Sequence, residues 1–289
     1  MLPYFLGVLA ALLIALIVII YKESTGFRIV SYQLVNNKLG CDEIKIAVIS
    51  DFHNRCLGSS NREIVDAVKS ISPDAVILAG DMIVSNIEDS CSYDNALSII
   101  RELAMEYPIY YGMGNHERKL IIRSDRFSGI YEKYVSELNK ASVHLLQNEK
   151  VTIEEANIDI YGLDMEHIYF RKVVKKKISD DYLEKIFGEN DLSRVSILIA
   201  HNPEHFGEYV KWAPDIVISG HVHGGIIGVP FLGGLISPQL KFFPKYDAGI
   251  FTEGNSTMIL SRGLGTHTVP IRLNNKAEII SLCIRKNNN

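Results

Sequence analysis

The chain has 289 residues, of which 47% are hydrophobic, so it is long and apolar enough to form one large domain with a buried core. Its net charge is −4 and its lysines and arginines are dispersed, which excludes the basic surface of a nucleic-acid-binding protein. The cysteines form no C-x-x-C pair and are expected to be reduced thiols; they are Cys41, Cys56, Cys91 and Cys283.

The first predicted element is an apolar helix. Residues 2–21 carry no charge, and their number is about the ~20 residues that a helix needs to cross a bilayer. A cleaved signal peptide is the competing interpretation, but the chain has neither a positive n-region nor a small-x-small cleavage site. Basic residues follow the span and none precedes it, so the positive-inside rule favours a single-pass anchor in the cell membrane with a cytoplasmic body. The predicted organisation is an anchor over residues 1–22, a linker over 23–43 and a domain over 44–286.

Short aliphatic runs alternate with amphipathic helices along the rest of the chain. Runs of this kind are typical of strands that are buried on both faces, which predicts an α/β fold. The predicted strands are residues 44–50, 74–79, 109–111, 196–200 and 215–219, and the predicted helices are residues 61–71 and 97–104. Further strands are predicted as a hairpin of residues 143–153 and 158–163, and as part of a second sheet at residues 256–260 and 278–284.

Polar side chains follow the predicted strands where each strand ends. Ligands of α/β sheets bind beyond the carboxyl ends of the strands, so these side chains are candidates for one site. Two histidines separated by one residue on a strand point to the same side, and flanking glycines let the backbone turn there. The candidates are Asp51, His53, Asp81, Asn115, His116, His201, His221 and His223.

The candidate residues offer oxygen and imidazole ligands without sulfur, a set that suits Mn, Fe, Zn, Co or Ni. Taken alone, an Asp or Asn after a strand is commonly a turn former or a helix cap. Taken together, the candidates exceed what one tetrahedral ion needs and suffice for two ions that share a carboxylate. Two such ions about 3.5 Å apart stabilise the attacking and leaving oxygens in phosphoryl transfer.

The order of these motifs resembles that of the calcineurin-like metallophosphoesterases. The motifs that carry the resemblance are Asp51-x-His53, Gly80-Asp81, Gly114-Asn115-His116-Glu117, His201 and Gly220-His221-x-His223. Further features resemble the branch with membrane-associated phosphodiesterases and UDP-diacylglucosamine pyrophosphohydrolases: the apolar N-terminus, Gly224-Gly225, and Arg262-Gly263-Leu264-Gly265 followed by Pro270-Ile271-Arg272.

The resemblance implies a two-sheet β-sandwich flanked by helices, an αββα arrangement, with two divalent transition-metal ions such as manganese, iron, zinc or cobalt. It implies that one ion is held by Asp51, His53, Asp81 and His223, and the other by Asp81, Asn115, His201 and His221. Asp81 bridges the two ions in this pattern. A hydroxide shared by the ions attacks phosphorus, and His116 protonates the leaving oxygen as the general acid.

Three departures from the family pattern occur, and none of them removes a metal ligand. Val84 stands where the family often has an acidic residue that orients the catalytic histidine. Val222 and Ile226 replace the Thr and Gln common around the two histidines, and Lys276-Ala277-Glu278 stands for a basic and acidic pair before the last strand. Arg262 and Arg272 are candidates for phosphate contact, although structural ion pairs are the favoured interpretation. Other histidines match no ligand position: His144, His167, His205 and His267.

The sequence therefore predicts a membrane-anchored, metal-dependent phosphoesterase. Its substrate is a phosphodiester or pyrophosphate, with a lipid-linked or nucleotide-linked compound as the favoured kind, and its membrane contact is made by residues 2–21. A phosphomonoesterase or protein phosphatase is the alternative enzyme, and a catalytically silent membrane scaffold is the alternative from another class. The substrate, the metal, the oligomeric state and the membrane face stay open at this point.

Overall fold

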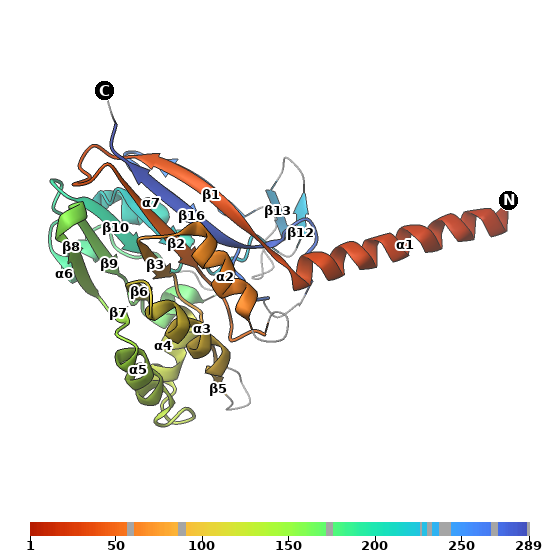
Figure 1. The fold of residues 1–289 in the computed structure, drawn as a ribbon, viewed down its shortest axis with the longest axis horizontal. Coiled ribbons are helices and arrows are strands. Elements are labelled where there is room, and N and C mark those ends of the chain that lie inside the picture. The colour runs from red at the N-terminus through yellow and green to blue at the C-terminus, as the bar shows by residue number, and fades with distance from the viewer. Residues whose placement is uncertain are drawn as a thin grey trace.

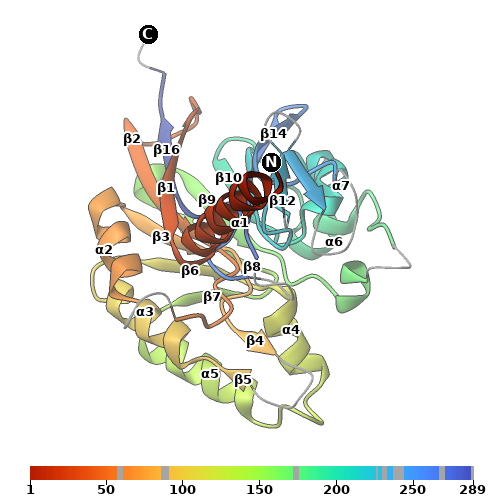
Figure 2. The ribbon, with the colours of Figure 1, turned by 90° about the vertical axis from the view of Figure 1, so that its right-hand side faces the viewer.

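The computed structural model (Figure 1) describes residues 1–56, 61–85, 91–171, 176–225, 227–229, 233–236, 244–266 and 271–287. Two six-stranded sheets form the body of the molecule. Helices flank both sheets, with α2 (Arg62–Ile71), α3 (Asp94–Ala104) and α5 (Ile130–Lys140) on one side and α6 (Tyr182–Phe187) and α7 (Phe206–Tyr209) on the other (Figure 2). The predicted α/β class with two sheets flanked by helices is confirmed.

The first sheet contains both ends of the body. Its order is β1 (Phe27–Val35), β16 (Ala277–Arg285), β2 (Glu43–Ile49), β3 (Ala75–Leu78), β6 (Ile109–Gly112) and β7 (His144–Leu146). Strands β2, β3, β6 and β7 are parallel to one another, whereas β16 is antiparallel to β2. The helices on its outer side are α2 (Arg62–Ile71), α3 (Asp94–Ala104), α4 (Asn115–Ile122) and α5 (Ile130–Lys140).

The second sheet has a parallel centre with antiparallel strands at its two edges. Its order is β14 (Gly249–Glu253), β15 (Ser256–Leu260), β11 (Ile216–Ser219), β10 (Val195–Ile199), β9 (Ile158–Gly162) and β8 (Glu149–Ile153). Helices α6 (Tyr182–Phe187) and α7 (Phe206–Tyr209) cover it. Two short ribbons complete the described strands: β4 (Val84–Ser85) with β5 (Cys91–Ser92), and β12 (Ile227–Val229) with β13 (Gly233–Ile236).

Alternating side chains along each strand build three apolar layers. In β2, Ile46 and Val48 pack between the sheets, while Ala47 and Ile49 pack beneath the helices of the first sheet. Successive side chains of a strand point to opposite faces, so an apolar residue at every position fills both layers. This burial on both faces explains the continuous aliphatic runs in the sequence.

Three predictions about strands differ from the structure. Residues 23–43 were predicted to be a linker, but Phe27–Val35 pairs along its whole length with β16 and is part of the first sheet. Residues 149–153 and 158–162 do form a hairpin, whereas His144–Leu146 joins the first sheet because it pairs with β6. Ala277–Arg285 also lies in the first sheet, so its prediction as a strand of a second sheet is wrong.

Helix α1 (Leu2–Thr25) projects away from the two sheets (Figure 1). Its segment Pro3–Thr25 contains an apolar window with a mean hydropathy of 2.8 that is 0% buried, values typical of a membrane span or a signal sequence. The helix leaves at the sheet edge where the predicted site lies. Val30 pairs with Ile280, and Ile280 pairs with Val48, so the start of β1 is level with Asp51, directly beyond β2.

Candidate metal centre

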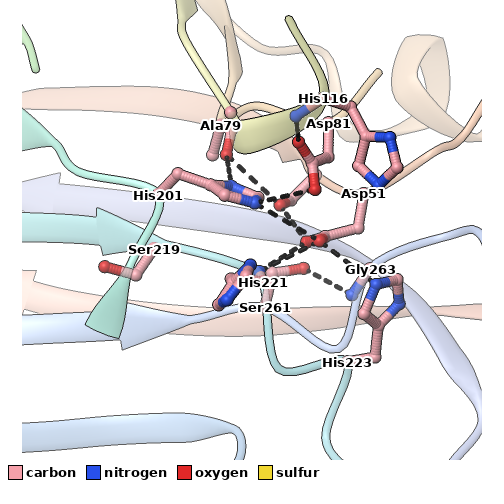
Figure 3. Close-up of polar contacts among 12 residues, drawn as sticks. Asp51, Ala79, Asp81, His116, His201, Ser219, His221, His223, Ser261 and Gly263 are labelled. Atoms are coloured by element: carbon pink, nitrogen blue, oxygen red, sulfur yellow. Dashed lines mark hydrogen bonds and ion pairs between the residues drawn. The ribbon is translucent and has the colours of Figure 1, made fainter. Parts of the chain in front are cut away.

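The two sheets bring the predicted ligands to one place (Figure 3). Each ligand follows a strand or begins the helix after it, so its position is set by an ordered element. The sources are β2 for Asp51 and His53, β3 for Asp81, the start of α4 for Asn115 and His116, β10 for His201, and β11 for His221 and His223.

The backbone is strained at these turns. Asp51, His53, Asp81, His221 and His223 have φ between 50° and 74°, the left-handed region that residues other than glycine rarely adopt. Backbone hydrogen bonds between strand ends hold the turns, including Asp51 N–H to Gly80 O at 3.0 Å and His53 N–H to Asp81 O at 3.0 Å. Strain of this kind persists where the surroundings enforce it and is concentrated at functional sites.

Two glycines allow the ligands to approach the backbone closely. A Cβ atom on Gly220 would lie 2.2 Å from Asp51 Oδ2, and a Cβ atom on Gly114 would lie 2.2 Å from Asp81 Oδ1. Both distances are far below van der Waals contact, so either substitution would displace a carboxylate. The glycines before His221 and Asn115 are therefore part of the site's geometry.

The side chains form overlapping groups of the kind that bind metal. One group contains Asp51, His53 and His223; His223 Nε2 lies 3.1 Å from His53 Nε2 and 3.3 Å from Asp51 Oδ1. Another contains Asp81, His201 and His221, with His201 Nε2 at 3.1 Å from Asp81 Oδ2. A third group joins His53 and Asp81 to His116. Potential ligand atoms within each group lie within 4.8 Å of one another.

The electrostatics of the site favour a positive charge between the carboxylates. Burial raises the pKa of Asp51 to about 6, although His201 opposes this rise. Burial also raises the pKa of Asp81, but His201 and His116 hold that pKa well below its usual range. Burial lowers the pKa of His201, yet Asp81 and Asp51 raise it to about 10. The carboxylates of Asp51 and Asp81 thus stabilise a positive charge at His201, and a metal cation bound between them would be stabilised in the same way.

Asn115 provides an independent test of whether the site fits a metal. Its Oδ1 atom is buried and accepts no hydrogen bond within the described part of the chain. A buried polar atom without a partner is costly, and ligation of a cation would remove that cost. Together with carboxylate oxygens and imidazole nitrogens, this atom completes a donor set that fits divalent transition metals.

Surrounding groups fix the orientation of the candidate ligands. His201 donates Nδ1–H to Ala79 O at 2.7 Å, which leaves Nε2 directed at Asp81. Asp51 accepts hydrogen bonds from the Ser50 hydroxyl and from His221 N–H at 3.0 Å. Such partners keep a ligand in the position that a metal needs.

Glu117 connects two of the strand ends. Its carboxylate accepts backbone N–H groups from Asp81 at 2.9 Å, Met82 at 2.8 Å and Gly114 at 3.0 Å, and it accepts the Tyr111 hydroxyl at 2.6 Å. In the sequence, Glu117 stands out only as part of the motif Gly114-Asn115-His116-Glu117. Its role in joining the turn after β3 to the start of α4 becomes visible only in the structure.

His116 is held by Ser85, next to the departure at Val84. Ser85 N–H donates to His116 Nδ1 at 3.0 Å, and the Ser85 hydroxyl lies 3.1 Å from the same nitrogen. A backbone N–H can only donate, so the neutral ring carries its proton on Nε2. Burial lowers the pKa of His116, which favours this neutral form. Ser85 therefore orients the ring that an acidic residue often orients in the family pattern.

The other departures and candidates have structural roles where they are described. Arg262 Nε lies 3.4 Å from Glu278 Oε2, and the Arg272 guanidinium donates to backbone carbonyls. These contacts agree with the interpretation of both arginines as structural residues. Val222 is buried in the apolar layer of the second sheet. His144 stacks on Tyr110. Three residues named in the sequence analysis lie outside the described residues: Ile226, His267 and Pro270.

Comparisons with known proteins agree with this geometry. Residues 44–225 match the family model described as calcineurin-like phosphoesterase. Uncharacterized protein YpbG of Bacillus subtilis is 27% identical, covering 96% of this chain and 96% of that protein. Phosphodiesterase YaeI of Escherichia coli is 25% identical, covering 91% and 90% of the two chains. UDP-2,3-diacylglucosamine pyrophosphatase LpxG of Chlamydia muridarum is 23% identical, covering 77% and 78%.

Proposed function

The chain belongs to the calcineurin-like phosphoesterase family, and from this premise we propose that it is a membrane-anchored enzyme that hydrolyses a phosphodiester or pyrophosphate bond with two divalent metal ions. The observation that carries the proposal is the pair of buried Asp/His groups, which is typical of a dinuclear metal site in this family. Related chains whose names state an activity, phosphodiesterase YaeI and UDP-2,3-diacylglucosamine pyrophosphatase LpxG, support diester or pyrophosphate chemistry.

The proposed ligand sets follow the groups in the structure. Asp51, His53 and His223 hold one ion with Asp81, and His201, His221 and Asn115 hold the other with Asp81. The supporting observation is that Asp81 belongs to one group with His53 and to another with His201 and His221. A carboxylate shared in this way is suited to bridge two ions.

The chemistry divides between the ions and the chain. When bound, the two ions supply Lewis-acid polarisation of the phosphoryl group and activation of water. The carboxylates of Asp51 and Asp81 and the histidines fix the positions of the ions. His116 lies in one group with His53 and Asp81, so its ring borders the reacting phosphoryl group, where it donates a proton or hydrogen bond to the leaving oxygen.

Hydrolysis of matched model substrates tests the proposed function. With Mn²⁺ bound, the purified chain should hydrolyse bis(p-nitrophenyl) phosphate or a nucleoside diphosphate ester faster than p-nitrophenyl phosphate. A preference for the monoester would favour a phosphomonoesterase instead. A chain that binds both ions but hydrolyses none of these substrates would be a silent scaffold.

The apolar helix α1 supports the proposed anchor. Burial of about twenty apolar residues in a bilayer does not depend on ionic strength, so high salt and carbonate washes should leave the full chain in the membrane fraction. A chain lacking residues 1–22 should appear in the soluble fraction and stay active. Release of the full chain by carbonate would contradict the anchor, and a shortened product would identify residues 2–21 as a cleaved signal.

A further inference from the structure

The end of helix α1 is fastened to the segment before β16 and to Arg55, which lies two residues after the candidate ligand His53. The Glu23 carboxylate accepts Asn275 N–H at 2.9 Å, and the Ser24 hydroxyl accepts Arg272 N–H at 3.0 Å. The Arg55 guanidinium donates to Ser24 O, where a cation also suits the negative end of the helix dipole. Ser24, Arg272 and Asn275 are all buried. These contacts give α1 a fixed attachment to the body.

One path leads from Glu23 to His223 through a single residue. The side-chain amide of Asn275 donates to His223 O at 2.7 Å and to Gly225 O. Its Oδ1 atom accepts from Arg262 Nη1 at 2.9 Å, so both ends of the amide are engaged and its orientation is fixed. Asn275 thereby holds the turn after His223, while Glu23 holds the backbone of Asn275.

A second path leads from Ser24 to Asp51. The Arg272 guanidinium donates to the carbonyls of Arg262 at 2.8 Å, Gly263 at 3.2 Å and Gly265. The loop that these carbonyls belong to donates back to the end of β2, with Leu264 N–H to Ser50 O at 3.0 Å and Gly265 N–H to Asp51 O at 2.6 Å. Arg272 thus holds that loop against Asp51.

Both paths end on the same metal-binding group. Asp51 and His223 belong to one group with His53, whereas the other group is reached one step further on, through the His221 N–H that donates to Asp51. Contacts that only attached the helix to the body would be expected to affect the binding of both ions equally. Removing these contacts should therefore change the affinity for one ion more than the affinity for the other, and this difference can be measured.

We propose that Glu23 and Ser24, at the end of the apolar helix, are positioning residues for the ion held by Asp51, His53 and His223. The inference rests on the proposed dinuclear site. The helix end determines how tightly that ion is bound and affects the ion at His201 and His221 less, because the helix end reaches His221 one step further on, through the His221 N–H bond to Asp51. The attachment of the chain to the membrane and the loading of its metal centre are then coupled through the hydrogen bonds that Glu23 accepts from Asn275 N–H and that Ser24 accepts from Arg272 N–H.

Mn²⁺ titration of the full chain in detergent, followed by the electron paramagnetic resonance signal of free Mn²⁺, tests the proposal. Changing groups that orient metal ligands typically costs about 10–100-fold in metal affinity. Glu23 and Ser24 act on the ligands through Asn275 and Arg272 and not directly. Glu23→Ala and Ser24→Ala should therefore each weaken one of the two Mn²⁺ sites by a smaller factor, about 3–10-fold. Asn275→Ala should weaken the same site by about 10–100-fold.

Conservative variants separate positioning from folding. Glu23→Gln and Ser24→Thr keep an oxygen that accepts the same N–H groups, so they should restore wild-type affinity. Thr25→Ala is the matched control, because the Thr25 hydroxyl is exposed and, among the described residues, donates to Tyr21 O within the helix itself. Should Glu23→Ala fail to fold, Ser24→Ala carries the same expectation through Arg272.

Three results would overturn the inference while leaving the proposed function intact. They are unchanged Mn²⁺ affinities in Glu23→Ala and Ser24→Ala, equal weakening of both sites, and failure of the conservative variants to restore affinity. A wild-type chain that binds no Mn²⁺ would instead overturn the proposed function, and this inference with it.

Discussion

Replacing Asp81 by alanine should remove both metal ions and lower the rate of hydrolysis by at least about a hundred-fold, equivalent to ~3 kcal/mol in the barrier. Asp81 shares one potential metal group with His53 and another with His201 and His221, so its loss weakens both. Its Oδ1 atom also accepts His116 N–H at 2.8 Å, which ties the turn after β3 to α4. Elemental analysis of the purified variant checks the expectation, with the rate on a model diester as the second readout.

A second buried carboxylate offers a matched control. Asp159 in β9 is equally buried but pairs with Lys150 at 3.0 Å and with Arg194 at 3.1 Å, outside the groups of potential metal ligands. Asp159→Ala should therefore keep both ions even if it lowers stability. His201→Ala, which affects one group, should cost less metal than Asp81→Ala. Full metal content in Asp81→Ala would contradict the bridging assignment.

Replacing His116 by alanine should retain both ions and slow the hydrolysis of an alkyl diester far more than that of a p-nitrophenyl diester. An alkoxide leaving group needs a proton as its bond to phosphorus breaks, whereas p-nitrophenolate leaves without one. A positioned acid typically contributes about 10²–10⁴-fold. Rates on the two substrates, measured with metal content, check this expectation, and His144→Ala on the exposed surface of β7 serves as the control.

Because of Ser85, we expect the rate loss in His116→Ala to lie near the lower end of the range of about 10²–10⁴-fold. The backbone N–H of Ser85 favours the ring with an unprotonated Nδ1, which is a weaker acid than the imidazolium. The hydroxyl of Ser85, 3.1 Å from Nδ1, can accept a hydrogen bond from Nδ1–H when the ring becomes charged. Equal rate losses on both diesters would indicate phosphate binding by His116, and a loss of metal would make it a ligand.

Much of the fold could be predicted because its signals are local. The spacing of apolar residues predicted helices over 61–71 and 97–104, and the structure has α2 and α3 there. The aliphatic runs of β2, β3, β10 and β11 were visible because burial on both faces leaves few polar positions in these strands. The convergence of Asp51, Asp81 and His201 followed from the rule that ligands bind at the carboxyl ends of strands.

Strand β1 could not be predicted for a physical reason. It is an edge strand in which Arg28, Ser31 and Gln33 interrupt the apolar residues, so it lacks a continuous aliphatic run, and its partner β16 lies at the opposite end of the chain. When two strands are this far apart in the sequence, neither segment shows which strand it pairs with. The position of α1 beside the metal centre depends on this pairing and was therefore also missing from the prediction.

The groups that support the ligands were missed for a related reason. Ser85 acts on His116 partly through its backbone N–H, which every residue except proline has. Asn275 acts through an amide that reaches the turn after His223, and its sequence neighbours show no metal-binding pattern. Residue type and spacing predict the ligands themselves, whereas these supporting contacts follow from how distant loops pack.

Titration of Mn²⁺ into metal-depleted chain, with the rate of bis(p-nitrophenyl) phosphate hydrolysis recorded at each addition, tests the central claim most directly. The account predicts that hydrolysis is absent without metal, returns as Mn²⁺ binds, and reaches its plateau when two ions are bound per chain. Full activity in the metal-depleted chain, or a plateau at one bound ion, would contradict the proposed dinuclear centre.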